Sequence, residues 1–187
     1  MKGAMSAGYL LGALGLLLAS CATNRLAVTG GQSDIGRDSD PVEEQVAIGF
    51  EYQGLPLEGG LGGEGGIRYG RDDGSVVLGG VPSEVFDVTS EVLEVYGGAR
   101  YEWALDRFRP FLAGGMSAVS AEVSRASEDL YSGSNDSDIG LYLTGGALFQ
   151  VSDLIYLGAS VRKTFGHDIG KLDIDATQIL LTLAFGF

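Results

Sequence analysis

A strict alternation of large apolar residues with small or polar ones, repeated in several strand-length segments, is the feature that most limits what this chain can form. The pattern is clearest in residues 176–187, where most of the intervening residues are small or polar. The apolar positions there are Ile179, Leu181, Leu183, Phe185 and Phe187. Successive side chains of a β-strand point to opposite faces, so a period of two predicts strands with one apolar face.

The alternation recurs along the chain and predicts an all-β fold of eight strands. In residues 25–35 only Leu26 and Val28 follow it clearly. In residues 109–123 we assign Phe111, Val119 and Val123 to the apolar face. The predicted strands cover residues 25–35, 44–54, 61–71, 88–104, 109–123, 138–151, 154–165 and 176–187.

The connections between the predicted strands are of two kinds, which alternate along the chain. Short turns are expected at residues 54–60, 105–108 and 152–153, and longer polar connections at residues 37–43, 72–87, 124–137 and 166–175. This is the layout of a transmembrane β-barrel. We therefore predict an eight-stranded antiparallel up-and-down transmembrane β-barrel. An even number of strands brings both termini to one side, which we predict to be periplasmic, with the long acidic loops extracellular.

Charge is distributed unevenly along the chain. The formal net charge is −13, and the four long connections carry almost all of it. Such a chain repels phosphate backbones, which argues against a nucleic-acid partner. Within the predicted strands, the charged residues lie largely opposite the apolar face. They include Glu51, Glu64, Arg68, Glu94, Arg100, Glu102 and Arg162.

A membrane barrel has an apolar exterior and a polar lumen, and eight strands leave an interior just wide enough for side chains. We therefore predict that these charged residues form a network of pairs that plugs the lumen, so that the barrel is not an open pore. A proton or ion path is the functional alternative for the same residues. Aromatic residues near the predicted strand ends fit the interfacial girdles of such barrels. They are Trp103, Phe111, Phe149 and Phe187.

The opposite arrangement is a water-soluble barrel, in which the apolar face points inward. Leu181 and Leu183 would then be enclosed, whereas Glu94, Arg100 and Arg162 would lie on the exterior. Such a protein would be a lipid-anchored periplasmic β-barrel that binds a small apolar ligand. The side of the wall on which these residues lie therefore separates the two interpretations.

The N-terminal segment has the pattern of a secretory signal peptide. Lys2 is followed by an apolar stretch that is too short for a spanning helix. We assign residues 1–20 to the signal peptide and residues 21–187 to the barrel domain. Residues 18–21, Leu-Ala-Ser-Cys, resemble the bacterial lipobox, which implies that Cys21 is lipidated. The alternative is that Cys21 is an incidental small residue beside an ordinary cleavage site.

Two further segments resemble a known family. The terminal strand that ends at Phe187 resembles the C-terminal signal of bacterial outer-membrane barrels, which the barrel-assembly machinery recognises. The sequence VYGGARY at residues 95–101, followed by RPFLAGG at residues 109–115, resembles the small OmpA-like outer-membrane barrel domains. The resemblance implies a Gram-negative outer-membrane protein, surrounded by lipid. With the lipobox it also implies passage through the lipoprotein-sorting machinery, and we expect a monomer.

We expect a structural or surface-exposed role without catalysis. Some eight-stranded barrels of this kind modify lipid A with a histidine, a serine and an acid, which makes His167 the candidate for an alternative lipid A- or phospholipid-modifying enzyme. The glycine-rich run at residues 59–66 lacks the Lys-Ser/Thr of a phosphate loop, and the acidic clusters lack calcium-loop spacing. We therefore predict no catalytic, cofactor-binding or metal site.

Overall fold

The protein forms a closed β-barrel, seen in a computed structural model that describes residues 22–35, 44–56, 58–78, 84–126, 134–166, 168–169, 172–173 and 176–187. The wall consists of β1 (Ala22–Ile35), β2 (Glu44–Pro56), β3 (Gly59–Leu78), β4 (Glu84–Trp103), β5 (Phe108–Ala126), β6 (Ser134–Gln150), β7 (Ile155–Phe165) and β10 (Ala176–Gly186). A separate small hairpin pairs β8 (Asp168–Ile169) with β9 (Leu172–Asp173). Among the described residues, no helix has the length and apolar character needed to cross a membrane.

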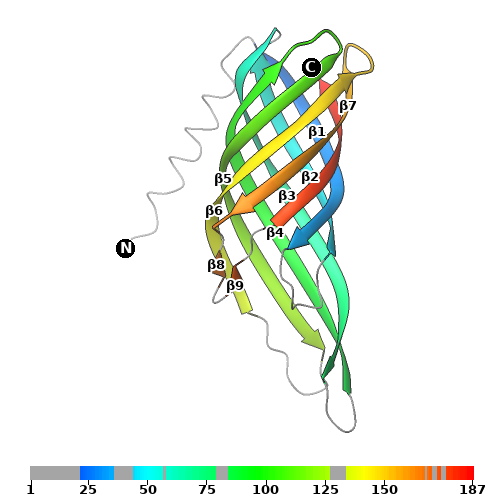
Figure 1. The fold of residues 1–187 in the computed structure, drawn as a ribbon, viewed down its shortest axis with the longest axis vertical. Helices are drawn as coiled ribbons and strands as arrows, with labels where there is room; N and C mark the ends of the chain where they lie inside the picture. Colours follow the sequence, from blue (N-terminus) through cyan, green and yellow to red (C-terminus); the bar gives the residue numbers. More distant parts are fainter. Residues whose placement is uncertain are drawn as a thin grey trace, which may run out of the picture.

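The order of the strands around the barrel confirms the predicted eight-stranded antiparallel architecture (Figure 1). Each strand pairs with its neighbour in sequence along the wall, and β1 pairs with β10 to close it, from Arg25 opposite Gly186 to Ile35 opposite Ala176. The first predicted strand is therefore real, although only two apolar positions indicated it. The predictions for residues 1–20 and for Cys21 lie outside the described residues.

The short turns lie together at one end of the barrel, the turn end, and the longer connections lie at the other, the loop end (Figure 1). The turn between β4 and β5 is tight, because Leu105 and Phe108 exchange two backbone hydrogen bonds of 3.0 Å. Between them, Asp106 has a φ of 57°, a left-handed conformation that aspartate tolerates better than most residues.

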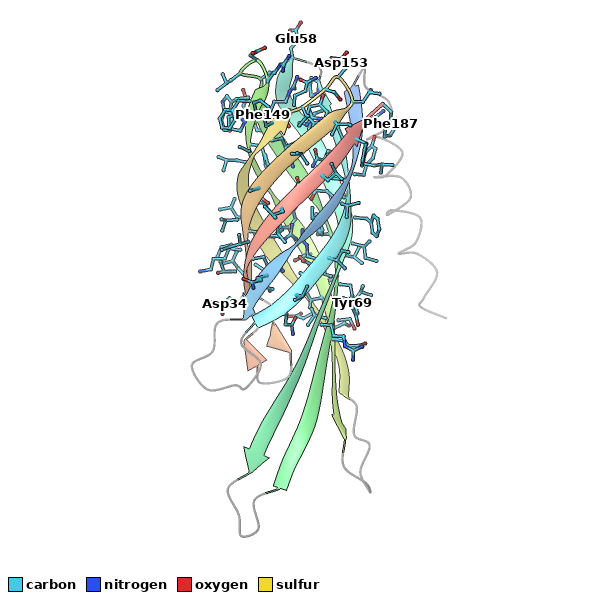
Figure 2. The ribbon with its side chains drawn as sticks, turned by 90° about the vertical axis from the view of Figure 1, so that its right-hand side faces the viewer. Asp34, Glu58, Tyr69, Phe149, Asp153 and Phe187 are labelled. Atoms are coloured by element: carbon cyan, nitrogen blue, oxygen red, sulfur yellow. The ribbon has the colours of Figure 1, made fainter. Side chains whose placement is uncertain are left out.

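Two of the predicted long connections are mostly strand. Instead of a connection at residues 72–87, β3 runs to Leu78 and β4 begins at Glu84, with the two strands paired throughout. Likewise, β5 runs to Ala126 and β6 begins at Ser134. Figure 2 shows β3 and β4 projecting beyond the rest of the barrel at the loop end, and β5 pairs with β4 along this projection as far as Asp87 opposite Ala126. The prediction was wrong here because it relied on the alternation of apolar and polar residues. Backbone pairing between the strands continues beyond the segments that show this alternation.

The apolar face of the strands points outward. Exposure alternates without interruption along β10, and Leu181 is 68% exposed. Trp103, Phe149 and Phe187 also face outward, as predicted. Phe149 and Phe187 lie near the turn end, whereas Tyr69 lies at a second level towards the loop end (Figure 2). Between these two levels the wall presents the apolar band that a bilayer requires.

The predicted facing of β5 was wrong. Phe111 is only 4% exposed and Val119 is also buried, so both face the lumen, whereas Leu112 and Met116 face outward. Aromatic character suggested an outward position for Phe111, but the ring packs beneath the Arg100 guanidinium, whose carbon lies 3.5 Å from the ring centroid. The prediction for Val123 concerns a side chain outside the described set.

Candidate functional site in the barrel lumen

The charged residues that the sequence singled out face the interior of the barrel. Six of them are buried, and Glu51 is half-buried. The buried six are Glu64, Arg68, Glu94, Arg100, Glu102 and Arg162. The arrangement expected of a soluble barrel is not seen, since Leu181 and Leu183 are exposed. The charged side chains lie in three layers along the barrel axis.

The layer nearest the loop end is built around Glu94. Arg68 donates from Nη1 to Glu94 Oε2 at 3.2 Å, and Arg162 donates from Nη2 to the other oxygen, Oε1. Arg68 Nη1 also donates to Gln178 Oε1 at 2.7 Å. The guanidinium of Arg162 lies 4.0 Å from the ring centroid of Tyr96 and stacks against a second tyrosine. One carboxylate thus serves two arginines in this layer.

The middle layer reverses that ratio, because one arginine serves two carboxylates. Arg100 donates from Nη1 to Glu51 Oε1 at 3.3 Å and to Glu64 Oε2 at 3.1 Å. Two phenols complete the layer: Tyr96 donates to Glu51 at 2.7 Å, and Tyr142 donates to Glu64 at 3.0 Å. Hydrogen bonds to both carboxylates help to offset the cost of burying them.

Lumen-facing glycines make room for these two phenols. A Cβ atom added to Gly98 would lie 2.7 Å from Tyr142 Oη, and one added to Gly66 would lie 2.8 Å from Tyr96 Oη. The two rings meet edge to face, with their centroids 5.4 Å apart. Glycine at these positions therefore allows the phenols to reach the carboxylates of the middle layer.

The layer nearest the turn end is centred on Glu102. Arg25 donates two hydrogen bonds, of 2.8 and 2.9 Å, to this carboxylate, and Arg109 donates a third of 3.1 Å. The sequence interpretation missed both arginines. Arg25 stands next to outward-facing Leu26, so the alternation of the first strand could have identified it. Arg109 lies two residues before Phe111 and therefore on the same face of β5. Because the sequence pattern placed Phe111 on the outer face, it did not identify Arg109 as a lumen residue.

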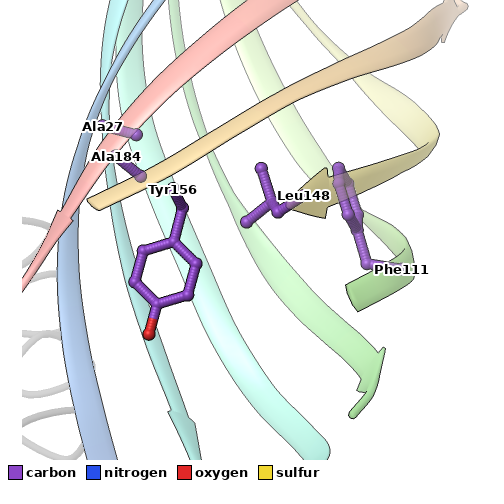
Figure 3. Packing of buried hydrophobic residues seen from close by; sticks show 5 residues of the cluster. All are labelled: Ala27, Phe111, Leu148, Tyr156 and Ala184. Carbon is purple, nitrogen blue, oxygen red and sulfur yellow. The ribbon is translucent and has the colours of Figure 1, made fainter. Parts of the chain in front are cut away.

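An apolar cluster accompanies the last layer at the turn end (Figure 3). Its members come from five strands and are all buried. They are Ala27, Phe111, Leu148, Tyr156 and Ala184. The ring of Tyr156 also stacks against Arg25, with 4.2 Å between the guanidinium carbon and the ring centroid. Charged pairs and apolar side chains therefore lie together at the turn end of the lumen.

The remaining candidates from the sequence are the histidine, the possible metal ligands and the assembly signal. His167 lies outside the described residues. No group of three or more histidine, cysteine, aspartate or glutamate side chains in the described parts of the chain could hold a metal ion. The proposed assembly signal lies on the outer face of β10, with the terminal phenylalanine beyond it. Its residues Ile179, Leu181, Leu183, Phe185 and Phe187 are all exposed.

Solved structures share this fold. Ail, the attachment invasion locus protein of Yersinia pestis in complex with the heparin analogue sucrose octasulfate, matches with a TM-score of 0.63 and 13% identity over 89% of this chain and 99% of Ail. Neisserial surface protein A matches with a TM-score of 0.56 and 14% identity over 90% of this chain and 98% of that one. A major outer membrane protein from Thermus thermophilus matches with a TM-score of 0.56 and 10% identity, over 90% and 100% of the two chains.

No curated protein sequence matches the chain. The model of one protein family, described as the outer membrane protein beta-barrel domain, matches residues 10–187, which is nearly the whole chain. The closed antiparallel barrel, its apolar exterior and its polar interior agree with that match. The chain therefore belongs to the outer membrane protein beta-barrel domain family.

Proposed function

We propose that this protein is a structural or surface-exposed barrel of the Gram-negative outer membrane whose lumen is plugged by charged pairs and conducts no solutes. The supporting observation is that these pairs cross the lumen. Arg25 on β1 binds Glu102 on β4, and Arg162 on β7 binds Glu94, also on β4. In each pair the two strands lie three positions apart around the ring of eight.

Conductance tests the plug directly. The purified protein in planar lipid bilayers should show no stepwise current, because an eight-stranded interior is filled by its own side chains. A large open porin, reconstituted in the same way, is the positive control. Reproducible ohmic steps from the wild-type protein would contradict the proposal.

We also propose that both termini are periplasmic and that the loop end is extracellular. The even strand number and the grouping of the short turns at one end support this orientation. A single cysteine introduced into residues 127–133 should react with an impermeant maleimide on intact cells. A Ser152→Cys variant at the turn end should react only after permeabilisation. The reverse labelling pattern would invert the topology.

We infer that residues 1–20 are a signal peptide and that Cys21 carries the lipid. The lipobox-like sequence supports this, and β1 begins at Ala22, so acyl chains on Cys21 would start beside the wall at the turn end. Mass spectrometry of the N-terminal peptide should find a diacylglyceryl group on Cys21, and Cys21→Ser should lack it. An unmodified peptide that starts at Ala22 or Thr23 would exclude lipidation and, with it, the lipoprotein-sorting machinery.

The proposed partners in biogenesis and in the membrane follow from the outer face of the barrel. We propose a lipid-embedded, OmpA-like monomer that the barrel-assembly machinery inserts by way of its last strand. Phe187→Ala should therefore lower the fraction of heat-modifiable protein in cells while leaving in vitro refolding into vesicles intact. Equal loss in both experiments would indicate a stability effect instead of a recognition signal.

We propose no catalytic role. Lipid A from cells that express the wild-type protein should match lipid A from cells that express His167→Ala, as judged by mass spectrometry, and a difference would favour the enzyme alternative. A soluble carrier of an apolar ligand has no support, because buried arginines and glutamates line the interior. A polyanion like the one bound to Ail is also disfavoured here, since the long connections carry most of a net charge of −13.

A further inference from the structure

The loop end of the lumen contains a cavity that the proposed structural role does not use. Its volume is about 30 Å³. The polar side chains that line it are Ser33, Gln45, Arg68, Glu94, Thr164 and Gln178. A water molecule needs about 10–15 Å³ of such space, so the cavity admits a group of a few heavy atoms. Charged pairs and the apolar cluster lie at the opposite end of the lumen, away from this cavity.

The charged layer beside the cavity holds two arginines and one carboxylate, of which Arg68 and Glu94 line the cavity. Arg68 and Arg162 share the single carboxylate of Glu94, one on each oxygen. The next carboxylates towards the turn end are occupied by Arg100 in the middle layer. Neither Arg162 nor Asp138, which lies on the lumen side of β6, is among the residues that line the cavity. Buried charges are stable only when they are paired and hydrogen-bonded, so this layer favours an additional anion.

Arg68 also has a donor to spare. Its Nη1 atom donates to Glu94 and Gln178, and its Nη2 atom donates to Tyr96 at 3.4 Å. Its Nε atom is buried and has no hydrogen-bond partner, although the side chain lines the cavity. A buried donor without an acceptor is costly, and an acceptor oxygen in the cavity would remove that cost.

Gln178 supplies a second donor beside it. Its amide oxygen is occupied by Arg68, so the amide nitrogen is the group that it can offer to a ligand. Thr164, in contrast, acts as a wall, because its hydroxyl already exchanges hydrogen bonds with the backbone of Ala176. The Arg68 Nε–H and the Gln178 amide are therefore two N–H donors at the cavity.

We propose that this cavity binds a small oxyanion, a carboxylate or an inorganic anion of similar size, with Arg68 Nε and the Gln178 amide as its direct partners. Planar anions such as formate and nitrate suit both the volume and the donor set. The site is independent of whether the barrel conducts, and it gives the loop end a binding function in addition to the structural role.

The Nε–H resonance of Arg68 provides the test. The full chain, labelled with ¹⁵N and held in detergent micelles, is titrated with sodium formate or sodium nitrate at constant ionic strength, and with sodium chloride as the control for an anion without oxygen. Formate, nitrate or both should shift this resonance saturably. A response to formate alone would identify carboxylates as the ligand class, and a response to both would identify oxyanions in general.

Two glycine variants separate the cavity from the rest of the barrel. In Gly70→Ala the new methyl would lie 2.9 Å from Gln45 Oε1 and push that side chain into the cavity, so binding should weaken about tenfold or more. In Gly97→Ala the methyl faces outward with 3.8 Å to the nearest heavy atom, so binding should not change. Heat-modifiable migration on gels confirms that both variants are folded.

Three results would overturn the proposal. One is the absence of a saturable Arg68 shift up to about 100 mM anion, which is far above a millimolar Kd. Another is an equal shift with chloride, which would reflect ionic screening alone. The third is unchanged affinity in Gly70→Ala. Arg68→Lys provides an independent check, because it keeps the charge but removes the Nε–H, and it should bind formate about tenfold more weakly than the wild type.

Discussion

Replacing Arg100 with methionine should destabilise this barrel more than any change at an exposed arginine. Arg100 is 1% exposed and is the cation that binds both Glu51 and Glu64. Methionine keeps apolar contact with Phe111 but leaves the two carboxylates without a positive partner. Removing one member of a buried ion pair costs about 3–5 kcal/mol, because the remaining charge stays buried and uncompensated.

The matched control is Arg71→Met on the outer face. Arg71 lies 3.7 Å from Glu91, and the two side chains are 52% and 42% exposed. An exposed pair contributes about 0–1 kcal/mol. The two variants remove the same charge from neighbouring strands, so the difference between them isolates the effect of burial.

The measurement is urea unfolding in lipid vesicles, followed by the fluorescence of Trp103, the single tryptophan of the chain. With a slope of about 2 kcal/mol per molar urea, the Arg100→Met midpoint should fall by about 1.5–2.5 M and the Arg71→Met midpoint by less than about 0.5 M. Adding Glu64→Gln to Arg100→Met should recover about 1–3 kcal/mol, because it removes one of the stranded charges. Equal midpoints for the two arginine variants, or no recovery in the double variant, would refute the reasoning.

The remaining predictions concern packing, depth in the membrane and the last charged layer. Gly98→Ala should cost about 1–3 kcal/mol because its methyl would lie 2.2 Å from the Gly114 carbonyl oxygen and 2.7 Å from the Tyr142 hydroxyl. Gly97→Ala should change stability by less than about 1 kcal/mol, and equal urea midpoints for the two variants would contradict this. Trp103 should be quenched most strongly by lipids brominated near the head group, and strongest quenching at the chain ends would contradict its place in the girdle. Glu102→Gln should lower stability by about 3 kcal/mol, since three arginines lose their shared anion, and a wild-type midpoint would argue against the pairing.

Much of this fold could be read from the sequence, because a membrane barrel has an apolar surface on the outside. The predicted strand at residues 88–104 is observed as Glu84–Trp103, and that at residues 176–187 as Ala176–Gly186. In such strands the alternation identifies the facing of each side chain. Contact with lipid therefore requires apolar residues at every second position of the wall strands. Glu94 and Arg162 occupy the intervening positions, so the sequence pattern places them inside the barrel.

The failures have a common origin in positions where that constraint is absent. Phe111 is apolar but faces the lumen, where a guanidinium covers its ring, so hydrophobicity alone misplaces it. The strand ends at residues 72–78 and 84–87 pair without an alternating apolar face, so they were read as a loop. Arg25 escaped notice because its strand shows so few apolar positions. The roles proposed for Cys21 and His167 stay predictions.

The seam between β1 and β10 joins the first and last strands of the wall, which are separated by almost the whole chain. Neither can satisfy its outer row of backbone amides and carbonyls until the other has been synthesised. The ring therefore closes last, and until it does the free edges of β1 and β10 can pair with other chains, which makes closure the step at which aggregation competes with folding.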